Sequence, residues 1–292
     1  MRFFLLPIST RRTLLYCQKL QHLPPEKQTL VDKATTRAAK LWAGWERKEK
    51  GWQKKVVVYG NYLLRRIPYE EWGLKTVPPL STRRREEEIL GKQKSHLIFP
   101  ESLIPTTKAT SVLQTLATER ESLHRTRLMW CFVGMPISAP FALVPVIPNL
   151  PFFYLVYRAW SHWRALAGGK HVKFLCKNNL LSLSPSPILN SIYSPLLPSS
   201  PAAKESIADT NKTGPTTGNE SKEHVEETLL LSQSNGKQLV KALEIPELEV
   251  ELERAIWQVE IAIQNEKEEK VKNDKPPDTT KQNNDDTPRR EK

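Results

Sequence analysis

The sequence predicts a mainly α-helical protein, in which amphipathic helices accompany a proline-rich membrane hairpin and a disordered linker and tail follow. Residues 128–157 are thirty consecutive residues without a charged side chain. Apolar side chains recur at helical spacing in residues 26–66 and again in 244–270. Residues 182–243 begin with a stretch rich in Ser, Pro, Thr, Asn and Gly, and residues 271–292 are polar. Both segments bury too little apolar surface to offset the entropy of ordering them.

The uncharged stretch is the centre of a membrane hairpin predicted over residues 128–166. About 20 apolar residues span a bilayer as a helix, but an interior proline costs a helix about 3 kcal/mol. The stretch contains five prolines: Pro136, Pro140, Pro145, Pro148 and Pro151. We therefore expect two helical arms, near 122–135 and 150–167, joined by a bent segment. Basic flanks on both sides favour a re-entrant hairpin. The alternatives are a bent single span and a hairpin buried in a soluble core.

Charge divides the chain into a basic body and an acidic tail. Residues 1–204 hold 31 Lys and Arg against 12 Asp and Glu, a net charge of +19, whereas residues 205–292 hold 13 against 20, a net charge of −7. Apolar segments flanked by cations are typical of proteins at an anionic bilayer surface. Anionic lipids of the inner membrane are thus one expected partner. The residues expected to contact this surface are Arg125, Arg127, Arg164, Trp45 and Trp52.

Residues 1–25 have the composition of a mitochondrial presequence. They contain four basic side chains, several hydroxyl groups and no acidic residue, which is the pattern of an amphipathic targeting helix. Residues 26–181 are then predicted to be a membrane-associated helical domain. The basic amphipathic helix that opens it, with a break near Gly51, either lies on the membrane interface through its Trp side chains or packs on the protein's own core.

The remaining segments are shorter. Residues 66–80 are predicted to be a bent connector because prolines interrupt them, and Glu70 and Glu71 within it are expected to pair with neighbouring arginines. Residues 97–105 are predicted to be extended and residues 107–127 helical, with Gly168-Gly169 ending the second hairpin arm. The C-terminal helix 244–270 docks either on the body or on a partner helix.

No pattern in the sequence indicates catalysis. The glycine-rich phosphate loops, the zinc-protease motif and the serine-hydrolase motif are absent, and three scattered cysteines without CxxC spacing do not suggest zinc. We expect no catalytic residue, no metal and no cofactor, and therefore a protein that is not an enzyme. His162 follows Arg158 by four residues on one helical face. It is either a proton relay or an interfacial anchor beside Trp160 and Trp163.

Three blocks of sequence carry a resemblance to one family. They are PNLPFFYLVYRAWSHWRAL within residues 140–166, RIPYEEWGLK at 66–75 and ERAIWQVE at 253–260. They resemble the mitochondrial potassium–proton exchange-related proteins of fungi and other eukaryotes. The resemblance implies an inner-membrane protein involved in potassium/proton exchange and matrix volume homeostasis, and it carries no established catalytic residue. The positions it marks for testing are Pro148, Asn149, Pro151, Tyr154, Arg158, Trp160, His162 and Trp163.

The expected function is thus support of potassium/proton exchange in the mitochondrial inner membrane, as a subunit or regulator with both termini in the matrix. One hairpin without an acidic residue at bilayer depth does not form an alternating-access pathway by itself. The C-terminal helix is the expected contact with other subunits of an exchange system. The alternative is a basic matrix protein that binds nucleic acid or ribosomes at the membrane surface, although nucleic acid is the less expected partner.

Overall fold

The protein is described by a computed structural model that covers residues 1–18, 37, 40–92, 94–140, 150–196 and 227–273. It is mostly helical, as predicted, but it also contains a four-stranded sheet that the sequence did not reveal. The elements in chain order are β1 (Arg2–Pro7), β2 (Thr13–Gln18), α2 (Trp52–Arg65), α3 (Tyr69–Thr76), α4 (Thr82–Ile89), β3 (Ser95–Phe99), α5 (Thr106–Thr118), α6 (Glu121–Ser138), α7 (Leu150–Lys177), β4 (Leu181–Pro185), α8 (Pro187–Tyr193), the 3-10 turn η3 (Ser194–Leu196), α10 (Gln233–Leu243) and α11 (Leu248–Asn273).

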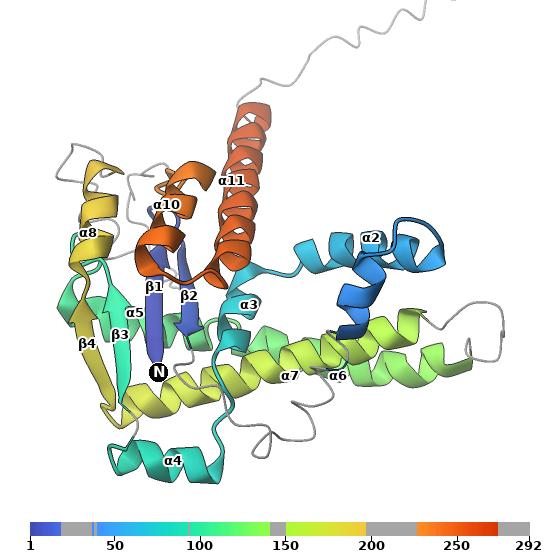
Figure 1. The fold of residues 1–292 in the computed structure, drawn as a ribbon, viewed down its shortest axis with the longest axis horizontal. Helices are drawn as coiled ribbons and strands as arrows, with labels where there is room; N and C mark the ends of the chain where they lie inside the picture. Colours follow the sequence, from blue (N-terminus) through green and yellow to red (C-terminus); the bar gives the residue numbers. More distant parts are fainter. Residues whose placement is uncertain (19–36, 38–39, 93, 141–149, 197–226, 274–292) are drawn as a thin grey trace, which may run out of the picture.

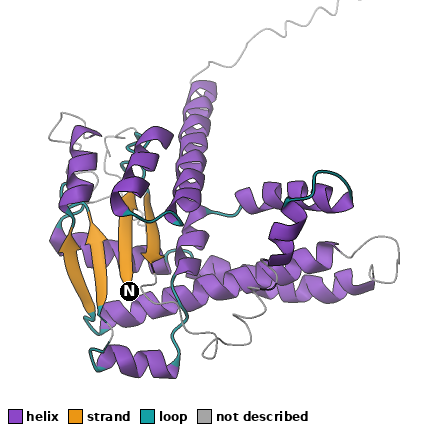
Figure 2. Cartoon of the chain, viewed as in Figure 1, coloured by secondary structure: helices purple, strands orange, loops and turns teal. Residues whose placement is uncertain are grey.

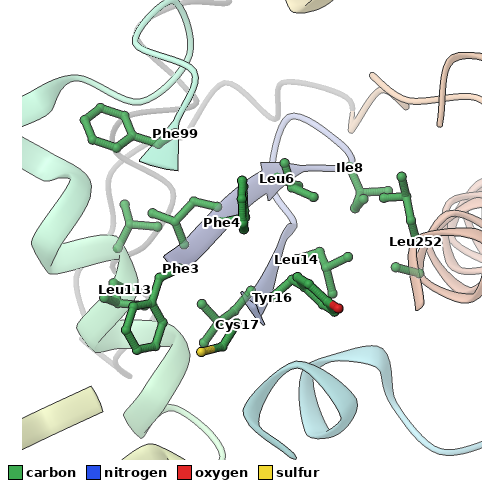
Figure 3. Close-up of a cluster of buried hydrophobic side chains, with 14 of the residues drawn as sticks. Phe3, Phe4, Leu6, Ile8, Leu14, Tyr16, Cys17, Phe99, Leu113 and Leu252 are labelled. Carbon is green, nitrogen blue, oxygen red and sulfur yellow. The ribbon is translucent and has the colours of Figure 1, made fainter. Parts of the chain in front are cut away.

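The sheet has the strand order β2-β1-β3-β4 and is mixed. β1 pairs antiparallel with β2 and parallel with β3, and β3 pairs parallel with β4. The apolar run of β1 is buried from Phe3 to Leu6, as expected for a strand that is covered on both faces. Its side chains join a core that includes Leu113 of α5 and Leu252 of α11 (Figure 3).

The presequence predicted over residues 1–25 is not confirmed, and its described part does not form the amphipathic helix expected of one. Residues 2–18 form β1 and β2, and the side chains of Phe3, Leu5 and Leu14 are buried in the core. The short apolar runs RFFLLP and TLLYCQ, separated by a turn, suit buried strands better than an amphipathic helix. This segment is therefore an integral part of the folded domain. Residues 19–25 lie outside the described residues.

The predicted hairpin is present as two helices, α6 and α7, that pack against each other. Figure 1 shows the sheet beside one end of α7, while the other end of the hairpin projects away from the sheet. The chain between the arms, residues 141–149, lies outside the described residues. Among the helices that are described, none combines the length and the hydrophobicity that crossing a membrane requires. The helical hairpin is confirmed, and its relation to a membrane is taken up below.

Gly168 and Gly169 do not end the second arm, because α7 continues to Lys177. They lie inside the helix at points where two other chain segments approach. A Cβ atom at Gly168 would lie 2.1 Å from the carbonyl oxygen of Leu74 in α3, and one at Gly169 would lie 2.8 Å from that of Ala117 in α5. The prediction treated the glycines as helix breakers, whereas the structure uses them for close helix packing.

Two further predictions about the middle of the chain are corrected. Residues 66–80 are not a bent connector, because Pro68 precedes a buried helix, α3, in which Glu71 is fully enclosed. Residues 107–127 are not one helix, since α5 ends at Thr118 and α6 begins at Glu121. The predicted break near Gly51 is confirmed: this glycine has a φ of 107° just before α2 begins. The extended segment near 97–105 is confirmed in part by β3.

The predicted linker over residues 182–243 is largely structured where it is described. It contains α8 and α10, and most of β4. Tyr193 is fully buried, and its hydroxyl donates a hydrogen bond to the carbonyl of Pro7 at 2.9 Å. Tertiary contacts of this kind order a segment whose composition alone suggests none. Residues 197–226 and 274–292, where the linker and tail continue, lie outside the described residues. The C-terminal helix is confirmed as α11.

The glycine contact gives a direct test of the packing. Changing Gly168→Ala should destabilise the protein by about 2 kcal/mol or more, since the new methyl group forces a backbone carbonyl aside. Gly44→Ala is the matched control, because Gly44 is helical with no atom within 4 Å of an added Cβ, and alanine there should stabilise slightly. Urea denaturation measures both changes, and equal stability of the two variants would contradict the close packing.

Candidate functional site

The three sequence blocks that carry the family resemblance meet at the base of the hairpin. The block at residues 66–75 forms most of α3, the block within residues 140–166 forms the first half of α7, and the block at residues 253–260 lies in α11. α3 packs on α7, and α11 packs on α3. In Figure 1, α3 stands between α7 and the lower end of α11. Polar and charged side chains from all three blocks, joined by one residue of α6, form a buried cluster at this junction.

A carboxylate–guanidinium pair is the centre of the cluster. Arg158 Nη1 donates to Glu71 Oε1 at 2.8 Å, and Arg158 Nη2 donates to Glu71 Oε2 at 3.1 Å. The Glu71 side chain is 0% exposed and that of Arg158 is 10% exposed. A planar guanidinium that meets both oxygens of a carboxylate gives the strongest form of ion pair. The pair therefore fixes α3 against α7 in one orientation.

Hydrogen bonds keep Glu71 ionised despite its burial. Desolvation by itself raises the pKa of this carboxyl, but the hydroxyl of Ser161, together with the charge and hydrogen bonds of Arg158, outweighs it and lowers the pKa below its usual range. The hydroxyl of Ser161 in turn accepts a hydrogen bond from Lys75 Nζ at 3.0 Å. Ser161 thus links the carboxylate and the ammonium of α3 through one side chain of α7.

Lys75 lies in a largely aromatic environment. Its Nζ is 3.2 Å from the centroid of the Trp72 ring and 5.6–5.7 Å from the ring centroids of Tyr157 and Trp160. Arg254 of α11 stacks on the Trp72 ring at 4.3 Å. Rings stabilise a nearby cation through their quadrupoles. Burial acts in the opposite direction and lowers the pKa of Lys75 to about 7.

The two histidines of the cluster have defined tautomers. A guanidinium only donates, so His162 Nε2, 3.0 Å from Arg158 Nη2, accepts. Neutral His162 therefore carries its proton on Nδ1 and donates it to His124 Nδ1, 3.0 Å away. His124 then carries its proton on Nε2, which has no hydrogen-bond partner among the described residues. Burial lowers the pKa of His162 to about 4 and also lowers that of His124, so both rings are neutral near pH 7.

Glu71, His124 and His162 also place three ligand atoms within 4.8 Å of one another, which suggests a metal site. The hydrogen bonds do not fit one. A metal on His162 Nδ1 would leave that ring without a proton, because its Nε2 accepts from Arg158. A divalent cation would also add two positive charges beside the charged Arg158. These three residues fit a hydrogen-bonded relay better than a metal centre.

α11 holds the start of α3 in place. Gln258 Nε2 donates to the carbonyls of Arg65 and Ile67, each at 2.8 Å, and its Oε1 accepts from the backbone N–H of Tyr69 at 2.9 Å. This one amide satisfies backbone groups on both sides of Pro68, where helix α3 begins. The block at residues 253–260 is thus connected directly to the block at residues 66–75.

The structure separates the positions that the resemblance marked for testing. Arg158, Trp160 and His162 belong to the cluster or border it. Pro151, Tyr154 and Trp163 are exposed and lie outside it. The interpretation of His162 as an interfacial anchor is wrong, since this side chain is only 1% exposed. Pro148 and Asn149 lie outside the described residues.

The residues expected at a membrane surface are mostly accessible. Arg125, Arg127 and Trp52 are exposed, and Trp45 is partly buried with its ring edge-on to Trp52 at 5.4 Å. Arg164 is partly buried and donates to the carbonyl of Lys75 at 3.2 Å.

Sequence reasoning missed much of the cluster. Glu70 and Glu71 do not pair with their neighbours in the chain: Glu70 binds Arg120 and Glu71 binds Arg158. Lys75 and His124 were not identified at all. The available signal was that each of the three blocks places charged side chains among aromatic and apolar ones, which is unusual for a solvated helix face.

Breaking the central pair should be costly. Glu71→Gln leaves the Arg158 guanidinium buried without a counter-charge, so it should destabilise the protein by about 3–5 kcal/mol. The double change Glu71→Leu with Arg158→Met removes both charges and should recover part of this loss. Urea denaturation of the two variants checks this, and a double variant less stable than Glu71→Gln would argue against a dominant charge effect.

The histidines give the protein an acid-sensitive stability. The pKa of His162 is about 4 in the fold against 6.5 when unperturbed, so the unfolded chain binds the proton first. The contribution of His162 to stability is therefore complete above pH 6.5 and should be lost as the pH drops toward 4. His162→Gln should flatten this fall in thermal melting curves, whereas His96→Gln, on β3 outside the cluster, should not. An unchanged pH profile for His162→Gln would exclude this assignment.

Comparison with known proteins places the chain in a family. Residues 2–176 match the family described as mitochondrial K+-H+ exchange-related. An uncharacterized protein of Schizosaccharomyces pombe is 32% identical over 170 residues, which cover 58% of this chain and 72% of that protein. An uncharacterized protein of Saccharomyces cerevisiae is 26% identical over 278 residues, which cover 87% of this chain and 82% of that protein. No solved structure matches significantly.

The matched region contains α3, α6 and nearly all of α7, and with them the Glu71–Arg158 pair and both histidines of the cluster. The chain is therefore a member of the mitochondrial K+-H+ exchange-related family.

Proposed function

We propose that this protein supports potassium/proton exchange at the mitochondrial inner membrane as a non-enzymatic subunit or regulator, and that the far end of the hairpin attaches it to the bilayer. The observation that carries the attachment is an exposed apolar surface on this end, which we call the hairpin tip. It is formed by Met129, Trp130, Phe132, Val133 and Ile137 of α6 and by Phe153, Tyr154 and Val156 of α7.

The hairpin tip is unusual for a surface in contact with water. Trp130 and Ile137 are each 69% exposed, and no charged residue occurs between Arg127 and Arg158. Contiguous exposed apolar patches mark sites that bind protein or membrane. A bilayer is favoured here because cations border the patch, with Arg125 and Arg127 at the polar end of the same helix.

The length of the apolar arm supports shallow insertion. The segment of α6 from Leu128 to Ser138 has eleven residues, which span roughly 16 Å at the helical rise per residue. This is about half of a hydrocarbon core of about 30 Å. An arm of this length reaches into one leaflet, which agrees with the re-entrant arrangement expected from the basic flanks.

Helix α2 provides a second surface of similar character. Trp52, Tyr59 and Tyr62 are each more than half exposed, and Lys54 and Lys55 lie on the same helix. Tryptophan and tyrosine beside lysine are typical of helices that lie at the headgroup level. The two surfaces together suit a protein held on an anionic membrane.

A regulatory or accessory role is the form of the function that the architecture favours. The buried cluster belongs to the base of the hairpin and is enclosed by protein, which favours a structural or regulatory role over an ion pathway. α11 is packed as far as Ile263, Glu266 binds Arg12, and the helix then continues into an exposed charged segment, Lys267 to Lys270. This segment is available to other subunits of an exchange system, whose identity the fold does not specify.

Membrane attachment is tested with the purified full-length protein and vesicles that contain phosphatidylglycerol. The double variant Trp130→Asp with Ile137→Asp should weaken binding at least about tenfold, because each large apolar side chain contributes about 1.5–3 kcal/mol on burial. The matched control carries Ile188→Asp and Val250→Asp, which are also exposed apolar positions but lie on α8 and α11. Equal binding by both variants would exclude the hairpin tip as the attachment site.

The role in exchange is tested by swelling of mitochondria in potassium salts. Mitochondria that lack the protein should swell at an altered rate, and the wild-type chain and the control variant should restore it, whereas the tip variant should not. Unchanged swelling without the protein would contradict the exchange role. Sedimentation that nuclease treatment abolishes would instead favour the alternative of a nucleic-acid-binding or ribosome-binding protein.

A further inference from the structure

The charges around Lys75 do not balance when it is protonated. Two carboxylates, those of Glu71 and Glu251, face three guanidiniums, and the two imidazoles are neutral, so protonation of Lys75 adds to an existing excess of positive charge. The charged and titratable groups of the cluster to which Lys75 belongs are Glu71 on α3, His124 on α6, Tyr157, Arg158, His162 and Arg164 on α7, and Glu251 and Arg254 on α11. The Arg164 guanidinium donates to the carbonyl of Lys75.

Lys75 has little access to water. It is 8% exposed, and its direct partners in the described part of the chain are uncharged: the hydroxyls of Ser161 at 3.0 Å and Tyr157 at 3.4 Å, and the face of Trp72. The guanidiniums of Arg158 and Arg254 repel the ammonium, while Glu71 and Glu251 attract it. A buried amine in such surroundings loses its proton more easily than a solvated lysine.

We propose that Lys75 and the ionic cluster around it form a proton-binding switch that couples uptake of one proton to the packing of α7 on α3. The switch lies at the base of the hairpin, where α7 packs on α3. Elsewhere along this junction, the two helices meet through apolar contacts and close backbone approach. This inference concerns the protein's response to pH and does not depend on membrane attachment.

The chemical step is a simple proton transfer. The lone pair of the neutral Lys75 amine takes a proton from solvent, and the resulting ammonium donates to Ser161, whose own proton points to Glu71. Burial is the main force against the added charge, and Arg158 on α7 also repels it, so protonation opposes the packing of α7 on α3. The pKa of about 7 for Lys75 places this change near neutral pH, whereas the lowered pKa values of His124 and His162 keep the rings neutral there.

The direction of the effect follows from linkage. The pKa of Lys75 in the fold, about 7, is below its ordinary value of 10.5, so between these limits the unfolded chain binds more protons than the folded one. Stability should therefore rise as the pH increases from 7 toward 10.5.

The proton site is measured directly by NMR of the full chain labelled at the lysine Cε. The Lys75 signal is identified by its absence from the spectrum of Lys75→Met, and it should titrate with an apparent pKa below about 9. A value at or above about 9 would overturn the proposal, because the amine would then remain charged throughout the neutral range. Lys170→Met, which removes an exposed lysine of α7, is the control that removes an ordinary signal.

The coupling is measured by amide hydrogen exchange of the wild-type protein, corrected for intrinsic rates, which also covers the case that Lys75→Met does not fold. Protection of the amides in α3 and in residues 157–165 of α7 should be lower at pH 6.5 than at pH 8.5 by several-fold, and protection in β1 should not change. Protection of α3 and α7 that is equal at both pH values would overturn the coupling.

Discussion

The bidentate pair between Glu71 and Arg158 is the interaction on which the arrangement of this protein depends. A buried carboxylate and a buried guanidinium each lose several kcal/mol of hydration, and only a close, fully hydrogen-bonded geometry offsets this loss. α3 and α7 must therefore meet in one register, with Ser161 and His162 completing the hydrogen bonds. Gly168 permits the same approach further along α7, where its hydrogen atom faces the carbonyl of Leu74.

The cluster also explains how the three blocks of sequence that resemble the family depend on one another although they lie far apart in the chain. Each block supplies groups that are unstable without the others. Glu71 needs Arg158, and the break at Pro68 needs the Gln258 amide of α11. His124, which no block contains, completes the set by accepting the hydrogen bond that His162 Nδ1 donates. A family of proteins related to potassium/proton exchange thus has, in this member, a buried set of titratable groups near the centre of the fold.

The two ends of the hairpin have opposite chemistry. The base is polar and enclosed by protein, whereas the tip is apolar and exposed to solvent. This is the reverse of a soluble helical pair, in which the apolar residues meet the core and the polar ones meet water. It is consistent with a base that fixes the orientation of the hairpin and a tip that requires a further apolar surface.

The sequence by itself determined the helical class, the two arms of the hairpin, the break at Gly51, the C-terminal helix and the family, because periodicity, proline and glycine positions and motif strings are local signals. Tertiary structure decided the rest. The apolar runs of residues 2–18 became buried strands only because β3 and the helices cover them. Gly168 became a packing contact instead of a helix end, and Glu71 became the partner of a residue 87 positions away. Burial and long-range charge pairing depend on which segments meet in space, and no local pattern contains that information.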